Sequence, residues 1–182
     1  MKSCVDVIVV GGGHAGIEAS SAVARYGCKV VLITLKKNQI GEMSCNPAIG
    51  GLGKGHLVRE IDALDGVMGR AIDQSGIQFR MLNKSKGPAV HGPRSQADRG
   101  LYKKSVQEIL TLQQKIRVIE GFVDDLIIKN QEIKGVVLDN RKKIFCNSLI
   151  ITTGTFLGGK IFVGDKTFEA GRIGDKSSSK LS

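Results

Sequence analysis

The chain has 182 residues, of which 41% are hydrophobic, and its 27 Lys and Arg against 17 Asp and Glu give a formal net charge of +10. This length and a mean hydropathy of −0.01 fit a water-soluble α/β domain with one core and exclude a chain too polar to fold. Met1 is followed by no charged and then apolar leader, and no apolar stretch approaches the ~18 residues that cross a bilayer. We therefore expect a cytoplasmic protein without membrane spans.

The positive charge favours an anionic partner such as nucleic acid, although a lysine-rich composition also arises without one. Cysteines occur at positions 4, 28, 45 and 146 without a C-x-x-C pair, and His56 and His91 lack metal-ligand spacing. We therefore expect reduced thiols and no metal site. Apolar strand segments surround all of the cysteines except Cys45, which is typical of small hydrophobic positions.

The first 34 residues predict a strand at 5–10, a helix at about 14–26 and a second strand at 29–34. Between strand and helix, Gly11, Gly13 and Gly16 have the G-x-G-x-x-G spacing of dinucleotide-binding turns. The first glycine allows the tight turn, the second lets backbone N–H groups approach a pyrophosphate, and the third lets the helix pack closely. The flanking strand and helix favour a phosphate-binding turn, with an ordinary loop as the alternative.

One part of this fingerprint is missing. An acid that holds a ribose hydroxyl is expected about 20 residues further on, but the second strand is followed by Leu35, Lys36 and Lys37. Thr34 or backbone groups are then the alternatives for binding the ribose, and the missing acid argues against ordinary NAD specificity. The two lysines either accept a 2′-phosphate or are simply solvated.

Residues 35–56 form a long glycine-bearing connection, whose length predicts a functional loop. Cys45 lies between small polar residues before a run of glycines, so we expect an exposed thiol that is either a nucleophile or incidental. The segment 50–55 lacks the first glycine and the Ser or Thr of a P-loop. We interpret it as a backbone-donor loop in which Lys54 and His56 face a cofactor or a substrate phosphate.

The next predicted elements are a helix at about 56–72, a strand at 77–82, a polar loop at 83–95 and a helix at about 96–114. Residues 84–104 carry six Lys or Arg against one acid, Asp98, which suits phosphate contacts by Arg94 and Arg99. Tyr102 is the only aromatic residue there, so base stacking has little support. A solvated helix face with its loop is the alternative.

Short strands are predicted from residue 117 onward, at about 117–120, 122–129, 133–138 and 143–146. We interpret them as an antiparallel β insertion over about 117–147. The apolar run at 149–154 predicts a buried parallel strand that returns beside the first strand. The expected fold is therefore α/β and Rossmann-like, a parallel sheet with helices and inserted antiparallel strands.

Seven blocks of the sequence, among them Ser-Cys-Asn-Pro-Ala-Ile-Gly-Gly-Leu-Gly-Lys-Gly-His-Leu-Val at 44–58, resemble one family. The blocks lie at 11–16, 44–58, 61–66, 76–80, 86–90, 96–99 and 154–157. They are similar to the N-terminal region of the tRNA uridine 5-carboxymethylaminomethyl modification enzymes, the GidA or MnmG family. Members run to several hundred residues, so the resemblance implies that residues 1–182 are an incomplete N-terminal part of an FAD-binding domain, with cofactor or substrate loops at 35–56 and 83–95.

The resemblance implies an FAD-dependent enzyme that acts with a GTPase partner of the MnmE type. It adds an aminomethyl or carboxymethylaminomethyl group to the 5-position of the wobble uridine of tRNA. Methylene-tetrahydrofolate is the implied carbon donor, glycine or ammonium the amine, and NADH the reductant. Full-length members are implied to form homodimers that join the GTPase in a heterotetramer, without a membrane.

The resemblance also implies roles for single residues. The cofactor-binding set is Gly11, Gly12, Gly13, His14, Ala15 and Gly16, with Val123 and Ser178 as further FAD contacts. Cys45 corresponds to one of two catalytic cysteines and acts as a nucleophile or proton handler at the pyrimidine. The absence of an acid after the second strand is a family trait in this interpretation.

Two alternatives remain. One is a related flavoprotein, the folate-dependent tRNA uridine methyltransferase or another FAD oxidoreductase; the 44–58 and 86–90 blocks favour the first family. The other is a nucleotide- or RNA-binding module without catalysis, or an inactive fragment. We expect the isolated chain to bind FAD weakly or not at all and not to modify tRNA.

Overall fold

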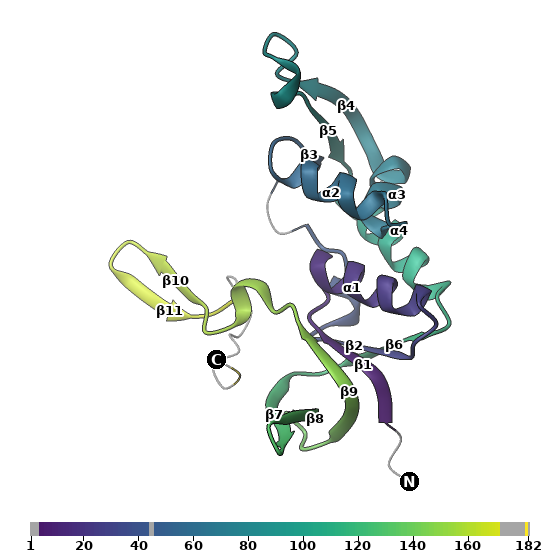
Figure 1. Cartoon of the computed structure of the whole chain (residues 1–182). Helices are drawn as coiled ribbons and strands as arrows, with labels where there is room; N and C mark the ends of the chain where they lie inside the picture. The colour runs from purple at the N-terminus through teal and green to yellow at the C-terminus, as the bar shows by residue number, and fades with distance from the viewer. Residues whose placement is uncertain (1–3, 44–45, 172–180, 182) are drawn as a thin grey trace. The chain divides into compact units, whose positions relative to one another are not determined.

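The computed structural model describes residues 4–43, 46–171 and 181. It divides into two compact units, of which unit 1 comprises residues 1–38 and 115–182, and unit 2 comprises residues 39–114. Unit 2 is thus an insertion in the sequence of unit 1 (Figure 1). No helix in the described ranges combines the length and apolar composition that crossing a membrane requires.

Unit 1 is built on a six-stranded sheet in the order β6-β2-β1-β9-β8-β7. The strands are β1 (Cys4–Val10), β2 (Val30–Thr34), β6 (Ile116–Glu120), β7 (Val123–Lys129), β8 (Glu132–Leu138) and β9 (Lys143–Ile151). β1 pairs in parallel with β2 and β9, and β2 pairs in parallel with β6. β8 pairs antiparallel with β7 and β9. The predicted α/β fold, with a parallel sheet and antiparallel strands added to it, is confirmed.

β2 is buried over its whole length and β1 over its last three residues, which fits their apolar sequences at the centre of a parallel sheet. Helix α1 (His14–Arg25) packs on one face, against β1, β2, β6 and β9, and buries Ile17 there. Ile8, Val31 and Val136 belong to a cluster of buried side chains that also includes residues of β7 and β9. The remaining elements of unit 1 are η3 (Gly154–Phe156) and the hairpin strands β10 (Lys160–Val163) and β11 (Lys166–Glu169), and η1 (Lys37–Gln39) spans the boundary in sequence between the two units.

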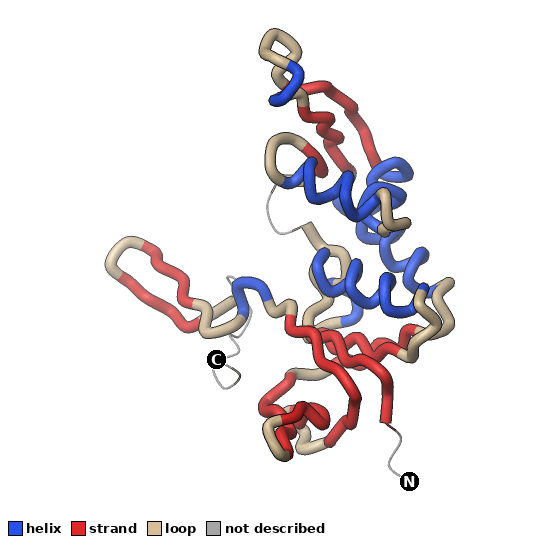
Figure 2. The backbone as a smooth tube through the Cα atoms, viewed as in Figure 1, coloured by secondary structure: helices blue, strands red, loops and turns tan. Residues whose placement is uncertain are grey.

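Unit 2 combines a three-stranded antiparallel sheet, in the order β3-β5-β4, with three helices (Figure 2). Its elements are β3 (Ala48–Gly50), α2 (Lys54–Asp62), α3 (Val67–Ser75), β4 (Gly76–Leu82), η2 (Pro88–Val90), β5 (Gly92–Ala97) and α4 (Arg99–Thr111). α3 packs on α4 through buried residues such as Ala71, Tyr102 and Val106, and α2 packs on β3 and β5. Asp98 caps α4 by accepting the N–H of Leu101 at 2.8 Å.

Several predicted elements of unit 2 were wrong. The single helix at 56–72 is two helices, because Asp65 takes a φ of +63° between them and a Cβ on Gly66 would overlap Ile61. The connection at 35–56 contains β3, and the polar loop at 83–95 contains the first residues of β5. Neither strand shows the alternation of apolar and polar residues from which a strand is predicted, and β3 has only three residues.

The β insertion also needs correction. The strand predicted at 117–120 is β6, which joins the parallel sheet beside β2. The runs predicted at 143–146 and 149–154 belong to one strand, β9, which ends at Ile151, because the exposed polar Ser148 pairs with Val7 of β1 between them. The second run was predicted to be buried, but Leu149 and Ile150 are half-buried and Ile151 is exposed. Cys146 is buried as expected, but Cys4 is exposed because β1 is buried only toward its carboxyl end.

Candidate functional site

The turn between β1 and α1 is fixed by the neighbouring strand. β1 ends at Val10, and the next residue, Gly11, has a φ of +113°, which only glycine adopts readily. The N–H of Gly11 donates to the carbonyl oxygen of Ile33 in β2 at 2.8 Å. The chain therefore leaves the sheet sharply while remaining hydrogen-bonded to it.

Close packing explains why the first and third positions of the fingerprint are glycines. A Cβ on Gly11 would overlap the carbonyl oxygen of Thr152, and a Cβ on Gly16 would overlap the carbonyl oxygen of Gly11. Thr152, which follows β9, donates both its N–H and its hydroxyl to the Val10 carbonyl, each at 2.8 Å. The returning strand β9 thus closes one side of the turn.

The other side of the turn is open. A Cβ placed on Gly13 has no described atom within 4 Å. Gly13 is also the N-cap of α1, where no side chain caps the helix and the first turn carries no acid. The first N–H groups of a helix lack intrahelical partners and favour an anion. This open, uncapped turn fits the diphosphate of a dinucleotide.

The structure supplies an acid at the end of β2 from another strand. Glu120, the last residue of β6, is paired with Thr34, the last residue of β2. Its carboxylate oxygen Oε2 accepts the N–H of Lys37 at 2.9 Å, and the N–H of Gly121 donates to the Thr34 carbonyl at 2.9 Å. Sequence reasoning missed Glu120 because it looked for the acid only after β2. Recognising 116–120 as the parallel neighbour of β2 would have found it.

The remaining site residues predicted from the family resemblance are the FAD contacts Val123 and Ser178 and the catalytic residue Cys45. Val123, the first residue of β7, is 3% exposed and belongs to the core of unit 1, so its side chain is not available to a ligand and only its main chain can contact one. Cys45 and Ser178 lie outside the described residues. Their roles therefore stay predictions.

Three predicted phosphate-contacting residues bond to backbone within unit 2. Lys54 Nζ donates to the carbonyl oxygen of Ala48 at 3.3 Å, and His56 Nδ1 accepts the N–H of Gly53 at 3.2 Å. Arg99 Nη1 donates to the carbonyl oxygen of Met43 at 3.1 Å. These bonds hold the connections around β3 and α2 in place, and contact of the same side chains with a phosphate remains a prediction.

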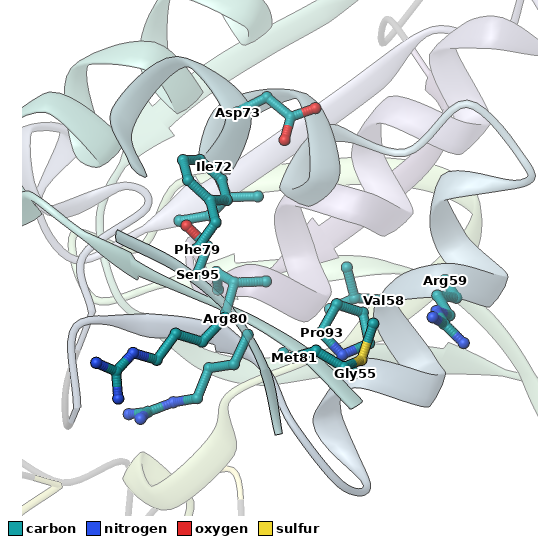
Figure 3. A pocket seen from close by; sticks show the side chains of 13 residues that line it. Gly55, Val58, Arg59, Ile72, Asp73, Phe79, Arg80, Met81, Pro93 and Ser95 are labelled. Carbon is teal, nitrogen blue, oxygen red and sulfur yellow. The ribbon is translucent and has the colours of Figure 1, made fainter. Parts of the chain in front are cut away.

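Arg94, the fourth predicted residue, lies in β5 beside a cavity of about 340 Å³ in unit 2 (Figure 3). Its lining is mainly apolar, from Ile49, Val58, Ile72, Phe79, Met81 and Pro93, with Arg59, Asp73, Arg80 and Ser95 among the polar members. Among the residues that the structure describes, no three His, Cys, Asp or Glu gather as metal ligands.

The model of the family described as glucose inhibited division protein A matches residues 6–182. The chain belongs to the GidA family. This result confirms the resemblance inferred from the sequence blocks.

Individual proteins of known family or structure are also similar to this chain. The tRNA uridine 5-carboxymethylaminomethyl modification enzyme MnmG of Granulibacter bethesdensis is 59% identical over 179 residues, which cover 97% of this chain and 28% of that protein. A crystal structure of Aquifex aeolicus GidA matches with a TM-score of 0.93 and 48% identity, covering 98% of this chain and 30% of the other. A GidA-related protein from Thermus thermophilus, with a TM-score of 0.65 and 17% identity over 98% of this chain and 66% of its own, shares the fold. The chain thus spans less than a third of the length of its GidA and MnmG relatives.

Proposed function

We propose that this chain supplies the FAD-binding turn of an enzyme that modifies carbon 5 of the wobble uridine in tRNA. The observation that carries the proposal is the open turn at Gly13, held between β1 and the end of β9. Membership of the GidA family supports it, as does the activity named for the 59% identical Granulibacter relative.

In this proposal, different residues of unit 1 bind the diphosphate and the adenosine of FAD. The uncapped N–H groups at Gly13, His14 and Ala15 hold the diphosphate. In parallel sheets, ligands lie outside the carboxyl ends of the strands. A dinucleotide that extends from β1 across β2 toward β6 therefore brings its adenosine to Glu120 and to the main chain of Val123.

The chemistry belongs to the whole protein. FAD, when bound, supplies electron exchange with NADH and with a carbon fragment derived from methylene-tetrahydrofolate. Cys45 acts at the pyrimidine as a nucleophile or proton handler. A GTPase partner of the MnmE type and a cytoplasmic homodimer complete the proposal.

A chimera tests it. Residues 6–182 replace the matching 28% of the Granulibacter enzyme, and the chimera is expressed in a strain that lacks its own enzyme. We expect a yellow protein that restores the carboxymethylaminomethyl base in tRNA, measured by nucleoside mass spectrometry. Protein that stays colourless when flavin is supplied overturns the proposal, and formation of ribothymidine instead supports the methyltransferase.

The same chimera tests Cys45. Cys45→Ser should abolish tRNA modification and leave the flavin absorbance unchanged, because the thiol serves the pyrimidine and not the diphosphate. Cys28→Ser, at a half-buried cysteine of unit 1, is the matched control and should retain modification. Modification that persists in Cys45→Ser removes this residue from the catalytic set and favours a binding module.

A further inference from the structure

Unit 2 contains a hairpin whose charged residues are all basic. This basic hairpin, Gly76–Ala97, comprises β4, the following loop with η2, and β5. It contains Arg80, Lys84, Lys86 and Arg94 but no Asp or Glu. A charge run without interspersed acids is the electrostatic pattern of a surface that meets an anion.

Two of these cations are held together by the sheet. Arg80 and Arg94 are directly paired across β4 and β5, and the preceding pair on the same face of the sheet is Gln78 with Gln96. Directly paired side chains share one face with their Cβ atoms about 4.5–5.5 Å apart, and like charges there destabilise the sheet. Among the described residues, no carboxylate lies within ion-pair distance of either guanidinium. The fold therefore keeps an unfavourable charge pair that an external anion would neutralise.

The two faces of this sheet differ. Ile49, Phe79 and Ser95 are aligned on one face, where Ile49 and Ser95 are buried. Figure 3 shows the side chain of Arg80 leaving its strand on the side away from Phe79. Arg80 is exposed and Arg94 partly so. The arginine face is therefore accessible within unit 2.

We infer that the basic hairpin binds the phosphate backbone of tRNA, with Arg80 and Arg94 at its centre and Lys84 and Lys86 at its tip. The inference rests on the proposed function, which makes tRNA the substrate. Guanidinium groups bind phosphate oxygens through two parallel hydrogen bonds. β4 ends at Leu82, and Lys84 and Lys86 follow in the loop beyond it, so the four cations are spread along the hairpin from the arginine pair to the tip. Cations spread along one element suit the successive phosphates of a polynucleotide better than a single diphosphate.

The test measures binding of unfractionated tRNA to the 182-residue chain as a function of salt concentration. Arg80→Gln with Arg94→Gln is the test variant. Arg70→Gln with Lys134→Gln is the matched control, which removes two exposed cations that pair with Asp65 at 3.7 Å and Glu132 at 2.5 Å. The logarithm of the affinity falls linearly with the logarithm of the salt concentration, and each lost phosphate contact makes this slope shallower by about one. The loss of one contact therefore weakens binding about tenfold more at 0.1 M salt than at 1 M salt. We expect this loss in the test variant and not in the control.

Measurements of stability and of flavin binding separate a phosphate-binding face from a structural one and from a dinucleotide site. Removing a like-charge pair should leave the melting temperature unchanged or raise it, and Arg80→Lys with Arg94→Lys should retain the salt slope.

Equal affinity in test and control variants overturns the inference, as does a parent chain that binds no tRNA at low salt. Loss of FAD from the chimera with unchanged tRNA affinity would make this face a dinucleotide site and overturn it too. A colourless chimera refutes the proposed function and leaves the tRNA measurement standing.

Discussion

At the scale of single residues, Gly13 and Gly16 of one turn have opposite surroundings. Gly16→Ala places a methyl group on the carbonyl oxygen of Gly11, so we expect the free energy of unfolding to fall by about 1–3 kcal/mol. The methyl group of Gly13→Ala meets no atom of the described residues within 4 Å, and the residue keeps an allowed φ of −77°, so the cost should stay below about 1 kcal/mol. Urea denaturation of the 182-residue chain measures both.

The same pair separates folding from binding. In the chimera, Gly13→Ala should weaken FAD retention, because the methyl group would occupy the open side of the turn, where we propose that the diphosphate binds. Equal destabilisation by the two substitutions would contradict the assignment of Gly13 to the ligand side.

Cys146 is the residue whose titration should affect stability. Its side chain is 2% exposed, and burial raises the pKa of its thiol above the ordinary value. In the unfolded chain the thiol loses its proton near pH 8.5, while the folded chain still binds it. The unfolded state then holds fewer protons, so the free energy of unfolding should fall as pH rises from about 8.5 until the folded thiol also ionises.

Comparison with Cys146→Ala isolates this effect, since other groups titrate in the same range. The parent chain should lose stability more steeply with pH than the variant, whatever the cost of the cavity at neutral pH. Parallel curves would show that burial does not control this thiol.

At the scale of elements, the β7–β8 hairpin contains a correctable strain. Lys129 pairs with Glu132, so Asn130 and Gln131 form a two-residue turn, with φ values of +52° and +61°. The left-handed conformation costs a residue with a side chain about 1–2 kcal/mol, and a glycine avoids this cost. Glycine loses more backbone entropy on folding than other residues, which cancels part of the gain in stability. Gln131→Gly should therefore raise the free energy of unfolding by about 0.5–1 kcal/mol. Gln131→Ala keeps the Cβ and should give no gain in the same denaturation experiment.

Predicting elements from the sequence succeeded where the pattern is local. The β1-turn-α1-β2 unit was predicted to within a residue or so at each end, because its apolar runs and glycine spacing are contained in 34 residues. β9 was predicted as two strands, because Asn147 and Ser148 interrupt its apolar pattern while β1 continues to pair with it. The break between α2 and α3 was missed because helical spacing of apolar residues continues across Asp65.

At the scale of the whole molecule, the chain covers 28% of its Granulibacter relative, so most of that protein's residues are not represented in it. We expect the 182-residue chain to bind FAD much more weakly than the chimera and not to modify tRNA by itself. Flavin fluorescence titration of both proteins measures the difference. Stoichiometric, tightly bound flavin in the purified chain would contradict this expectation.

The sequence by itself determined the glycine turn between β1 and α1, the α/β class and the family, because each depends on neighbouring residues or on short blocks of sequence that resemble the family. Only the tertiary structure brought Glu120 to the end of β2, Thr152 against Gly11, and Arg80 opposite Arg94. The physical reason is that these relations depend on which strands pair and in which register. Strand pairing joins segments far apart along the chain, and no local pattern of residues encodes it.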